Sequence, residues 1–267
     1  MPLPMRTMVL TLAYDGTDFV GWQRQARGRS VQGLLEEALG RLDGAPVEAR
    51  GAGRTDAGVH ALGQVASAVV RRDELSPSDL ARALNGLLPA DVRVVDVAEA
   101  PGRFDARFEA RGKLYRYRIA NTDVVPPFER RYVWAVRGRL DTAAMVRALR
   151  LCEGRHDFAA FQSTGSSVRH TVRTITRTGL AVDPLAPWSS GVHPDRRLIT
   201  IEIAGDGFLR HMVRAIIGTC VEIGSGRRTP GGMAEVLAAA DRSRAGPTAP
   251  AAGLFLVAVE YAAGAWQ

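Results

Sequence analysis

Lysine is almost absent from this chain, which has 267 residues and a single lysine, Lys113. Cysteine is scarce too: Cys152 and Cys220 allow at most one disulfide, and both fall in apolar helical patterns typical of buried thiols. No apolar run approaches the roughly 18 residues that a membrane-spanning helix needs. The first residues also lack the basic and apolar regions of a secretory signal, so we expect a cytoplasmic protein.

Clusters of metal-binding side chains are missing as well. The nearest histidine pair, His156 and His170, lies in segments with no other metal-type ligands, and no Cys/His spacing resembles a zinc site. We therefore expect no bound metal. Hydrophobic residues make up 46% of the chain, which is enough for a sizeable core and excludes a mainly disordered protein. The length allows one large or two ordinary domains.

The net charge of +7 comes almost entirely from arginine and is unevenly distributed. Between residues 111 and 155 the chain carries 11 Lys and Arg against 4 Asp and Glu. Because guanidinium groups bind phosphate bidentately, this excess suits a polyanionic partner. A solvated basic face, in a chain whose Ala, Arg and Gly content indicates a GC-rich genome, explains the charge equally well.

Hydrophobic periodicity predicts two successive halves that each mix strands with helices. In the first half we expect strands at 9–14, 63–70 and 92–97, and helices at 31–42 and 77–88. Ser30 and Ser76 are the expected N-caps of these two helices. In the second half we expect strands at 114–120, 172–182, 197–204 and 254–261, and helices at 141–152, at 209–224 and from Thr229-Pro230 onward. A long exposed loop is predicted over 183–196, which is rich in Pro, Ser and Gly.

These elements predict an α+β fold, in which two α/β-layered halves share a mixed, mostly antiparallel sheet with helices on one side. The halves are predicted to be residues 1–107 and 108–267. No Pro/Gly/Ser-rich linker stands at the join near 105–112, so we expect the halves to share one sheet and not to swing freely.

A glycine-rich segment, residues 51–61, carries the candidate chemistry. Three glycines in eight residues mark a tight loop whose backbone can approach a ligand closely: Gly51, Gly53 and Gly58. If Arg54 pairs with Asp56, the carboxylate stays ionised and oriented. It could then act as a nucleophile, a general base or a stabiliser of a cationic transition state. An aspartate in such a loop also commonly forms an Asx turn or a helix cap, and residue chemistry alone leaves both roles open.

The run GRTDAGVH, residues 53–60, resembles the signature of the tRNA pseudouridine synthase A family. Four further segments resemble the same family in the same order: DGTDFVGWQRQ at 15–25, FDARF at 104–108 with KLYRY at 113–117, FLRHMVR at 208–214, and AP followed by GL within 249–254. The matches span the chain from about Tyr14 to Tyr261. Five matches in family order exclude chance similarity.

The resemblance implies a tRNA-modifying isomerase that needs no metal and no cofactor. Pseudouridylation breaks the uracil–ribose bond, turns the base and rejoins it through carbon, without net redox change. Bond breaking leaves oxocarbenium-like charge on the sugar, which a carboxylate can stabilise or capture. The family implies a homodimer, uridines 38, 39 and 40 of the tRNA anticodon arm as targets, and a central RNA-binding cleft between the halves.

By the same resemblance, the catalytic role belongs to Asp56 as nucleophile, with Arg54 and Arg214 as the other catalytic residues. The half 1–107 would carry the catalytic loop. The basic half 108–267 would bind RNA and complete the pocket.

Four further residues take their expected roles from the resemblance and from local geometry. Tyr115 maps to the family's active-site tyrosine and could stack on an extruded uracil, whereas Tyr117, on the same strand face, is expected in the core. Core packing of both tyrosines is the alternative. His60 and Arg210 are predicted to contact the substrate. Arg210 is expected to share a helix face with Arg214, four positions later.

Two features depart from the family pattern, and two other functions stay open. Asp105 stands where many relatives have His and could orient Arg107 or Arg54, and the 183–196 loop is longer than expected. A metal-dependent phosphodiesterase could use Asp56 and His60 as ligands, but further carboxylates are missing beside them. A non-catalytic RNA-binding protein would need surface aromatics without a positioned carboxylate.

Overall fold

The computed structural model describes residues 5–71, 75–163, 168, 170–185 and 196–266. The chain forms two compact units, which we call unit 1 (Met1–Gly112 with Phe255–Gln267) and unit 2 (Lys113–Leu254). These ranges differ from the expected halves at the C-terminal end, because the last strand belongs to unit 1. That strand pairs with a strand of the first half, a long-range contact that the local sequence pattern does not reveal.

Unit 1 is built around a sheet with the strand order β4-β1-β3-β10, to which β2 adds by pairing with β3. Its elements are β1 (Arg6–Tyr14), α1 (Val31–Asp43), β2 (Ala49–Gly51), β3 (His60–Val70), α2 (Pro77–Leu87), β4 (Val92–Ala100) and β10 (Leu254–Glu260). β1 runs antiparallel to both β3 and β4, and β10 runs parallel to β3.

The two helices of unit 1 begin at the predicted caps. Ser30 accepts a hydrogen bond from the Gly33 N–H at the start of α1, and Ser76 accepts one from the Asp79 N–H at the start of α2. Gly44 ends α1 in a left-handed conformation with φ 74°. Local capping chemistry therefore fixes where both helices lie in the sequence.

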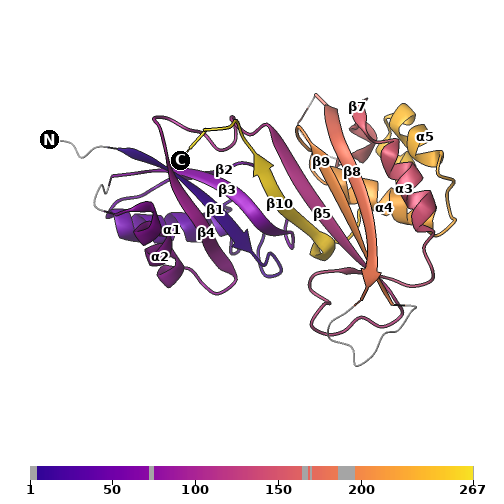
Figure 1. Ribbon diagram of the computed structural model, residues 1–267, viewed down its shortest axis with the longest axis horizontal. Coiled ribbons are helices and arrows are strands. Elements are labelled where there is room, and N and C mark those ends of the chain that lie inside the picture. The colour runs from indigo at the N-terminus through magenta and orange to yellow at the C-terminus, as the bar shows by residue number, and fades with distance from the viewer. Residues whose placement is uncertain (1–4, 72–74, 164–167, 169, 186–195, 267) are drawn as a thin grey trace. The chain divides into compact units, whose positions relative to one another are not determined.

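Both faces of the unit 1 sheet are covered, as the burial of β1 shows. Helices α1 and α2 lie on one face (Figure 1), where Met8 of β1 lies with Leu39 and Leu80. On the opposite face Val9 packs in a cluster with a non-helical segment that contains Phe104. This second cluster anchors the segment that follows β4, through Phe104 and Ala106.

Unit 2 is built around a sheet with the order β5-β9-β8-β7, and β6 pairs in parallel with β5. Its strands and α-helices are β5 (Gly112–Asn121), β6 (Trp134–Val136), α3 (Thr142–Arg150), β7 (Gly154–Asp157), β8 (Val172–Pro184), β9 (Arg197–Gly205), α4 (Met212–Gly224) and α5 (Gly232–Ala239). Short 3₁₀ helices span η1 (Ala159–Phe161), η2 (Arg242–Arg244) and η3 (Ala251–Gly253).

The core of unit 2 forms where the sheet meets its helices. Tyr117 and Ile201 are fully buried, and they alternate with Arg116 and Glu202, which form an ion pair of 2.7 Å on the other face. Helix α4 is buried along almost its whole length. Period-2 patterning of the strands thus separates an apolar, helix-covered face from a charged one.

Two predicted helix starts differ from the structure. Helix α4 begins at Met212 and not at Leu209, because His211 adopts a left-handed conformation with φ 63°. Helix α5 begins at Gly232, after a turn at Thr229 and Pro230. Of the predicted 183–196 loop, residues 186–195 lie outside the described residues, and its first two residues end β8.

The α+β class is confirmed, since both units mix helices with mostly antiparallel strands. A sheet shared by the two halves and a central cleft stay predictions. Within the ranges that the structure describes, no helix combines the length and the apolar character needed to cross a membrane.

Candidate active site

The loop that carries Asp56 joins β2 to β3 and lies against the segment that joins β1 to α1. The Trp22 N–H donates to the Thr55 carbonyl over 3.1 Å, and Gly21 and Asp56 form an isolated antiparallel bridge. The motifs 15–25 and 53–60 are therefore in direct backbone contact, through residues more than thirty positions apart in the sequence.

Glycine is required where these two segments approach each other. A Cβ on Gly16 would lie 2.0 Å from the Val59 carbonyl oxygen, and one on Gly21 would lie 2.5 Å from the Thr55 carbonyl oxygen. Gly21 also has φ 111°, a conformation that other residues rarely adopt. A side chain at either position would push the Asp56 loop away from its support.

Hydrogen bonds between uncharged groups support the Asp56 loop. The Tyr14 hydroxyl lies 2.8 Å from Thr55 Oγ1, and the Gln64 amide donates to the Gly53 carbonyl over 2.9 Å. These three side chains are all buried. Burial raises the pKa of Tyr14 to about 12, so the phenol is protonated at neutral pH. These two supports of the loop are therefore uncharged.

Asp56 itself combines a fixed backbone with a partly exposed side chain. Its backbone is held by the bridge to Gly21, and its carbonyl accepts from the Val59 N–H over 3.1 Å. Gly58, with φ 77°, lets the chain turn back into β3. The backbone on both sides of Asp56 is therefore fixed.

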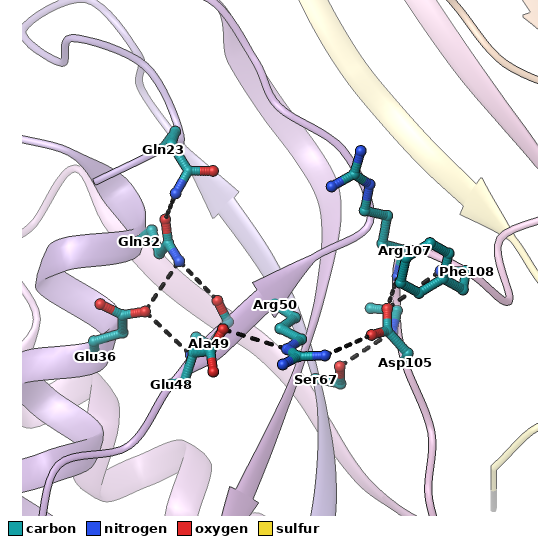
Figure 2. Close-up of polar contacts among 11 residues, drawn as sticks. Gln23, Gln32, Glu36, Glu48, Ala49, Arg50, Ser67, Asp105, Arg107 and Phe108 are labelled. Carbon is teal, nitrogen blue, oxygen red and sulfur yellow. Dashed lines mark hydrogen bonds and ion pairs between the residues drawn. The ribbon is translucent and has the colours of Figure 1, made fainter. Parts of the chain in front are cut away.

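Arg54 is exposed, and its Nε donates to Gln23 Oε1 over 3.0 Å. Gln23 in turn donates to Gln32 Oε1 over 2.7 Å, and Gln32 donates to Glu36 and to the Ala49 carbonyl, each over 3.0 Å (Figure 2). The arginine is thus oriented by a glutamine of the 15–25 motif. Its pairing with Asp56 stays a prediction.

His60 lies at the start of β3 and is only 1% exposed. Its Nδ1 is 3.0 Å from the Gly16 N–H and 3.1 Å from Asp15 Oδ1. Because the Gly16 N–H can only donate, Nδ1 is the acceptor of that bond, while Asp15 Oδ1 accepts from the N–H and hydroxyl of Thr17. The ring also stacks on Phe255 at 4.7 Å. These contacts are structural, and a contact of His60 with substrate stays a prediction.

Unit 2 carries the predicted tyrosine pair on β5. Tyr115 is 9% exposed and packs edge-on against Phe208, with ring centroids 5.0 Å apart. Tyr117 is fully buried, as expected for a core residue, and its hydroxyl donates to the Pro250 carbonyl over 2.8 Å. Burial raises the pKa of Tyr117 far above its usual range, although the Arg214 charge lowers it. The Tyr115 ring is therefore the more accessible of the two.

The two candidate arginines near α4 have different surroundings. Arg214 lies in the first turn of α4 and is half-buried, and its Nε donates to the Ala249 carbonyl over 2.7 Å. Arg210 precedes the helix and is exposed. The expectation that they share one helix face is wrong, because the left-handed His211 lies between them and the helix begins after it.

Contact between α4 and the segment 246–250 explains the position of Arg214. A Cβ on Gly218 would lie 1.7 Å from the Pro247 carbonyl oxygen, so only glycine allows this approach. The segment then supplies the neighbouring carbonyls of Ala249 and Pro250, which accept from Arg214 and Tyr117. One backbone segment thus fixes the candidate residue Arg214 and the core residue Tyr117.

Each unit therefore carries three of the six predicted site residues. Unit 1 holds Arg54 and Asp56 on one loop and His60 at the start of β3, whereas Tyr115, Arg210 and Arg214 lie in unit 2. That these two sets of residues come together in one active site stays a prediction. Among the described residues, no group of three or more His, Cys, Asp or Glu side chains lies together as metal ligands would.

Sequence reasoning missed the groups that support the loop. Tyr14, Gln64 and Gln23 appeared only as strand or motif residues, and their partners come from segments distant in sequence. The sequence signal for Gln23 was its place in the 15–25 motif. Asp105 also has a partner that was not expected: its Oδ2 lies 3.2 Å from Arg50, and its Oδ1 accepts from the Arg107 N–H over 2.8 Å (Figure 2).

Comparison with known proteins agrees with this arrangement of motifs. A family model described as tRNA pseudouridine synthase matches residues 11–109 and 131–262. A tRNA pseudouridine synthase A of Myxococcus xanthus is 47% identical over 257 residues, covering 96% of this chain and 92% of the relative. Proteins of the same name from Solidesulfovibrio magneticus and Chloroflexus aurantiacus are each 48% identical and cover 97% of this chain; it spans 92% and 90% of them.

Among solved structures, a chain of a Cbf5-Nop10-Gar1 complex matches 80% of this chain with 13% identity and a TM-score of 0.32. The match spans 45% of that chain, and a likeness this low carries no argument. The family model covers most of the sequence, and the curated relatives match over nearly their full length. The chain belongs to the tRNA pseudouridine synthase family.

Proposed function

We propose that this chain isomerises uridine to pseudouridine at positions 38, 39 and 40 of the tRNA anticodon arm, with Asp56 as nucleophile and no cofactor. As a tRNA pseudouridine synthase it is an isomerase that acts on uridine in tRNA. The observation that carries the assignment to Asp56 is its setting: a partly exposed carboxylate on a loop held in place by two other segments.

The reaction needs a fixed negative charge near the ribose ring. The bond from ribose C1′ to uracil N1 breaks, and positive charge develops on the sugar. The base turns, C1′ bonds to C5, the C5 proton leaves and N1 gains a proton, so that atoms and electrons balance. A carboxylate that is already in position can capture or stabilise the sugar cation without reorganising.

The environment of Asp56 supports this role. Its backbone is fixed by the bridge to Gly21, and the adjacent Thr55 is fixed by Tyr14 and Trp22. The side chains of Tyr14 and Gln64, which support the loop, are neutral. A backbone fixed in this way is what the proposed chemistry needs from the loop.

The remaining site residues are given roles that suit their positions. Exposed Arg54 and exposed Arg210 are proposed to contact the tRNA, Arg54 beside the target nucleotide and Arg210 at a phosphate. Tyr115, at the rim of the unit 2 core, is proposed to stack on the turned-out uracil. Arg214 is proposed as a further catalytic residue and His60 as a further substrate contact. The protein is proposed to be a cytoplasmic homodimer.

A carbodiimide map of pseudouridine tests the function directly. An unmodified tRNA transcript with uridine at position 39 is incubated with the purified protein, with and without excess EDTA. We expect new pseudouridine within positions 38–40 in both samples. A protein that binds the transcript but forms no pseudouridine would overturn the proposal, and activity that EDTA abolishes and divalent metal restores would overturn the cofactor-free mechanism.

A further inference from the structure

Phe108 has the highest exposed fraction, 78%, among the large hydrophobic side chains of the described residues. Its neighbours Phe104 and Ala106 are buried in the unit 1 core. The Ala106 N–H donates to Ser67 Oγ over 3.1 Å, and the Tyr261 hydroxyl donates to the Ala106 carbonyl over 2.7 Å. The exposed ring therefore stands on a segment that is anchored in the core and is not at the tip of a loose loop.

The turn that presents Phe108 is closed by Asp105. Asp105 Oδ1 accepts from the N–H groups of Arg107 and Phe108, over 2.8 and 3.2 Å (Figure 2). The Asp105 N–H donates to Glu109 Oε1 over 3.0 Å, and the Glu109 N–H donates back to the Asp105 carbonyl over 3.1 Å. These internal bonds fix the backbone of the turn on which the exposed Phe108 ring stands.

Positive charge lies beside the ring. The Arg107 guanidinium carbon lies 5.8 Å from the centroid of the Phe108 ring, and Arg107 is exposed. Arg50 of β2 lies 3.2 Å from Asp105 Oδ2, and it also contacts Glu48, so it serves mainly to orient Asp105 (Figure 2). The feature offered to solvent is thus an aromatic ring with an arginine guanidinium over it.

Arg50, the partner of Asp105, links this turn to the segment that leads to the Asp56 loop. A hydrogen bond leads from Arg54 to Gln23. From Gln23 the chain of hydrogen bonds continues through Gln32 to the Ala49 carbonyl, next to Arg50 (Figure 2). Arg50 precedes Arg54 by four residues on the strand and loop that lead to Asp56, a span of at most about 13 Å for extended chain. A polymer bound at the loop can therefore reach the Phe108 turn.

We infer that Phe108 and Arg107 form a second RNA contact, in which the ring stacks on an unpaired base and the guanidinium binds a neighbouring phosphate. The inference rests on the proposed function and assigns a second contact with the same tRNA. An aromatic ring stacks on any base, because every base has a π face, and a phenylalanine has no polar group with which to read base identity. The contact therefore adds affinity without choosing a sequence.

Filter binding of the unmodified tRNA transcript tests this contact in the full-length chain. Phe108→Ala should weaken binding by about tenfold, within the range of one lost stacking contact. Phe108→Trp should keep or increase the affinity, because it offers a larger ring. Leu87→Ala removes a 41% exposed side chain from α2 and serves as the matched control, expected within twofold of wild type.

Arg107→Gln separates the phosphate contact from the stacking contact. It should lower the slope of log affinity against log salt by about 0.7 to 0.9, the value of one phosphate. Phe108→Ala should leave this slope unchanged, because a phenyl ring displaces no counterions. If both variants changed the slope equally, the assignment of stacking to Phe108 and of phosphate binding to Arg107 would be wrong.

Three other outcomes would overturn the inference. The first is a tRNA affinity of Phe108→Ala within twofold of wild type, and the second is an equal loss of affinity for Phe108→Ala and Phe108→Trp. The third is a variant whose oligomeric state changes in light scattering while its tRNA affinity does not, which would point to a protein partner. Single-turnover isomerisation at saturating tRNA separates this contact from the proposed function. If wild type binds but does not isomerise, the proposed function fails while the binding comparison still reports on Phe108.

Discussion

Asp56 is the residue on which the proposed chemistry depends, and asparagine separates its charge from its shape. If the carboxylate acts in bond breaking, Asp56→Asn should lower single-turnover isomerisation at least ~10³-fold. Binding of tRNA should persist, because arginines supply most of the affinity and a neutral side chain repels phosphate less. Filter binding and single-turnover rates on the same transcript measure both. A variant that keeps more than about a tenth of the wild-type rate removes Asp56 from the mechanism.

Tyr14 offers a second test, because it touches the loop and not the substrate. Tyr14→Phe removes the hydroxyl that bonds to Thr55 Oγ1 and should cost about 1 kcal/mol of stability. We expect the single-turnover rate at saturating tRNA to fall while tRNA affinity stays constant, because the loop loses one of its fixed points. Ser76→Ala, which removes the N-cap of α2 at a similar cost, is the control. Equal rates for the two variants would show that Tyr14 contributes stability alone.

At the scale of elements, the contact between the 15–25 segment and the Asp56 loop is the decisive feature. Gly21→Ala places a Cβ 2.5 Å from the Thr55 carbonyl oxygen at φ 111°, so the loop has to move. A displacement of about 1 Å at a reacting group can cost ~10²-fold in rate, and we expect a loss of that order.

Gly86→Ala is the matched control for this glycine substitution. Gly86 lies within α2, and a Cβ added there would meet nothing within 4 Å, so alanine should stabilise the helix by about 0.5–1 kcal/mol. Single-turnover rates and urea midpoints of both variants check the prediction. A Gly21→Ala protein with wild-type turnover would show that the approach of the two segments does not set the position of Asp56.

The longer elements were predictable because their sequence carries a period and a cap. α1 and α2 are capped by Ser30 and Ser76 as predicted, and β1, β3, β5 and β9 overlap the ranges predicted for strands. The strands β2 and β6 were not predicted, since three residues are too short to show a period. The start of α4 was misplaced because the apolar pattern continues through Leu209, while the left-handed His211 is not encoded in hydrophobicity.

The candidate site was predictable as a set of motifs but not as a geometry. The motif around Asp56 and its family resemblance identified the loop. What holds the loop depends on residues from β1, β3 and the 15–25 segment that meet only in the folded chain. Likewise, Asp105 was expected to orient Arg107 or Arg54, and it bonds instead to the backbone of Arg107 and to Arg50.

At the scale of the whole molecule, the excess of arginine predicts a strong dependence of tRNA binding on salt. The positive excess after residue 110 suits about 4–6 phosphate contacts. At a slope of about 0.7 to 0.9 per contact, affinity should fall about two orders of magnitude between 50 and 200 mM salt. Filter binding across this range measures the slope. A nearly flat curve would mean that the arginines reflect genome composition and bind no phosphate.

Within unit 1, β3 comes before unit 2 in the sequence, whereas its neighbour β10 comes after it. Phe255 pairs with His60 and stacks on its ring, although 195 residues separate them in sequence. During synthesis on a ribosome, β3 and the loop before it therefore emerge long before β10, which must wait for the whole of unit 2. The nascent chain cannot complete the support around His60 until then, so the order of translation delays the maturation of this half of the site.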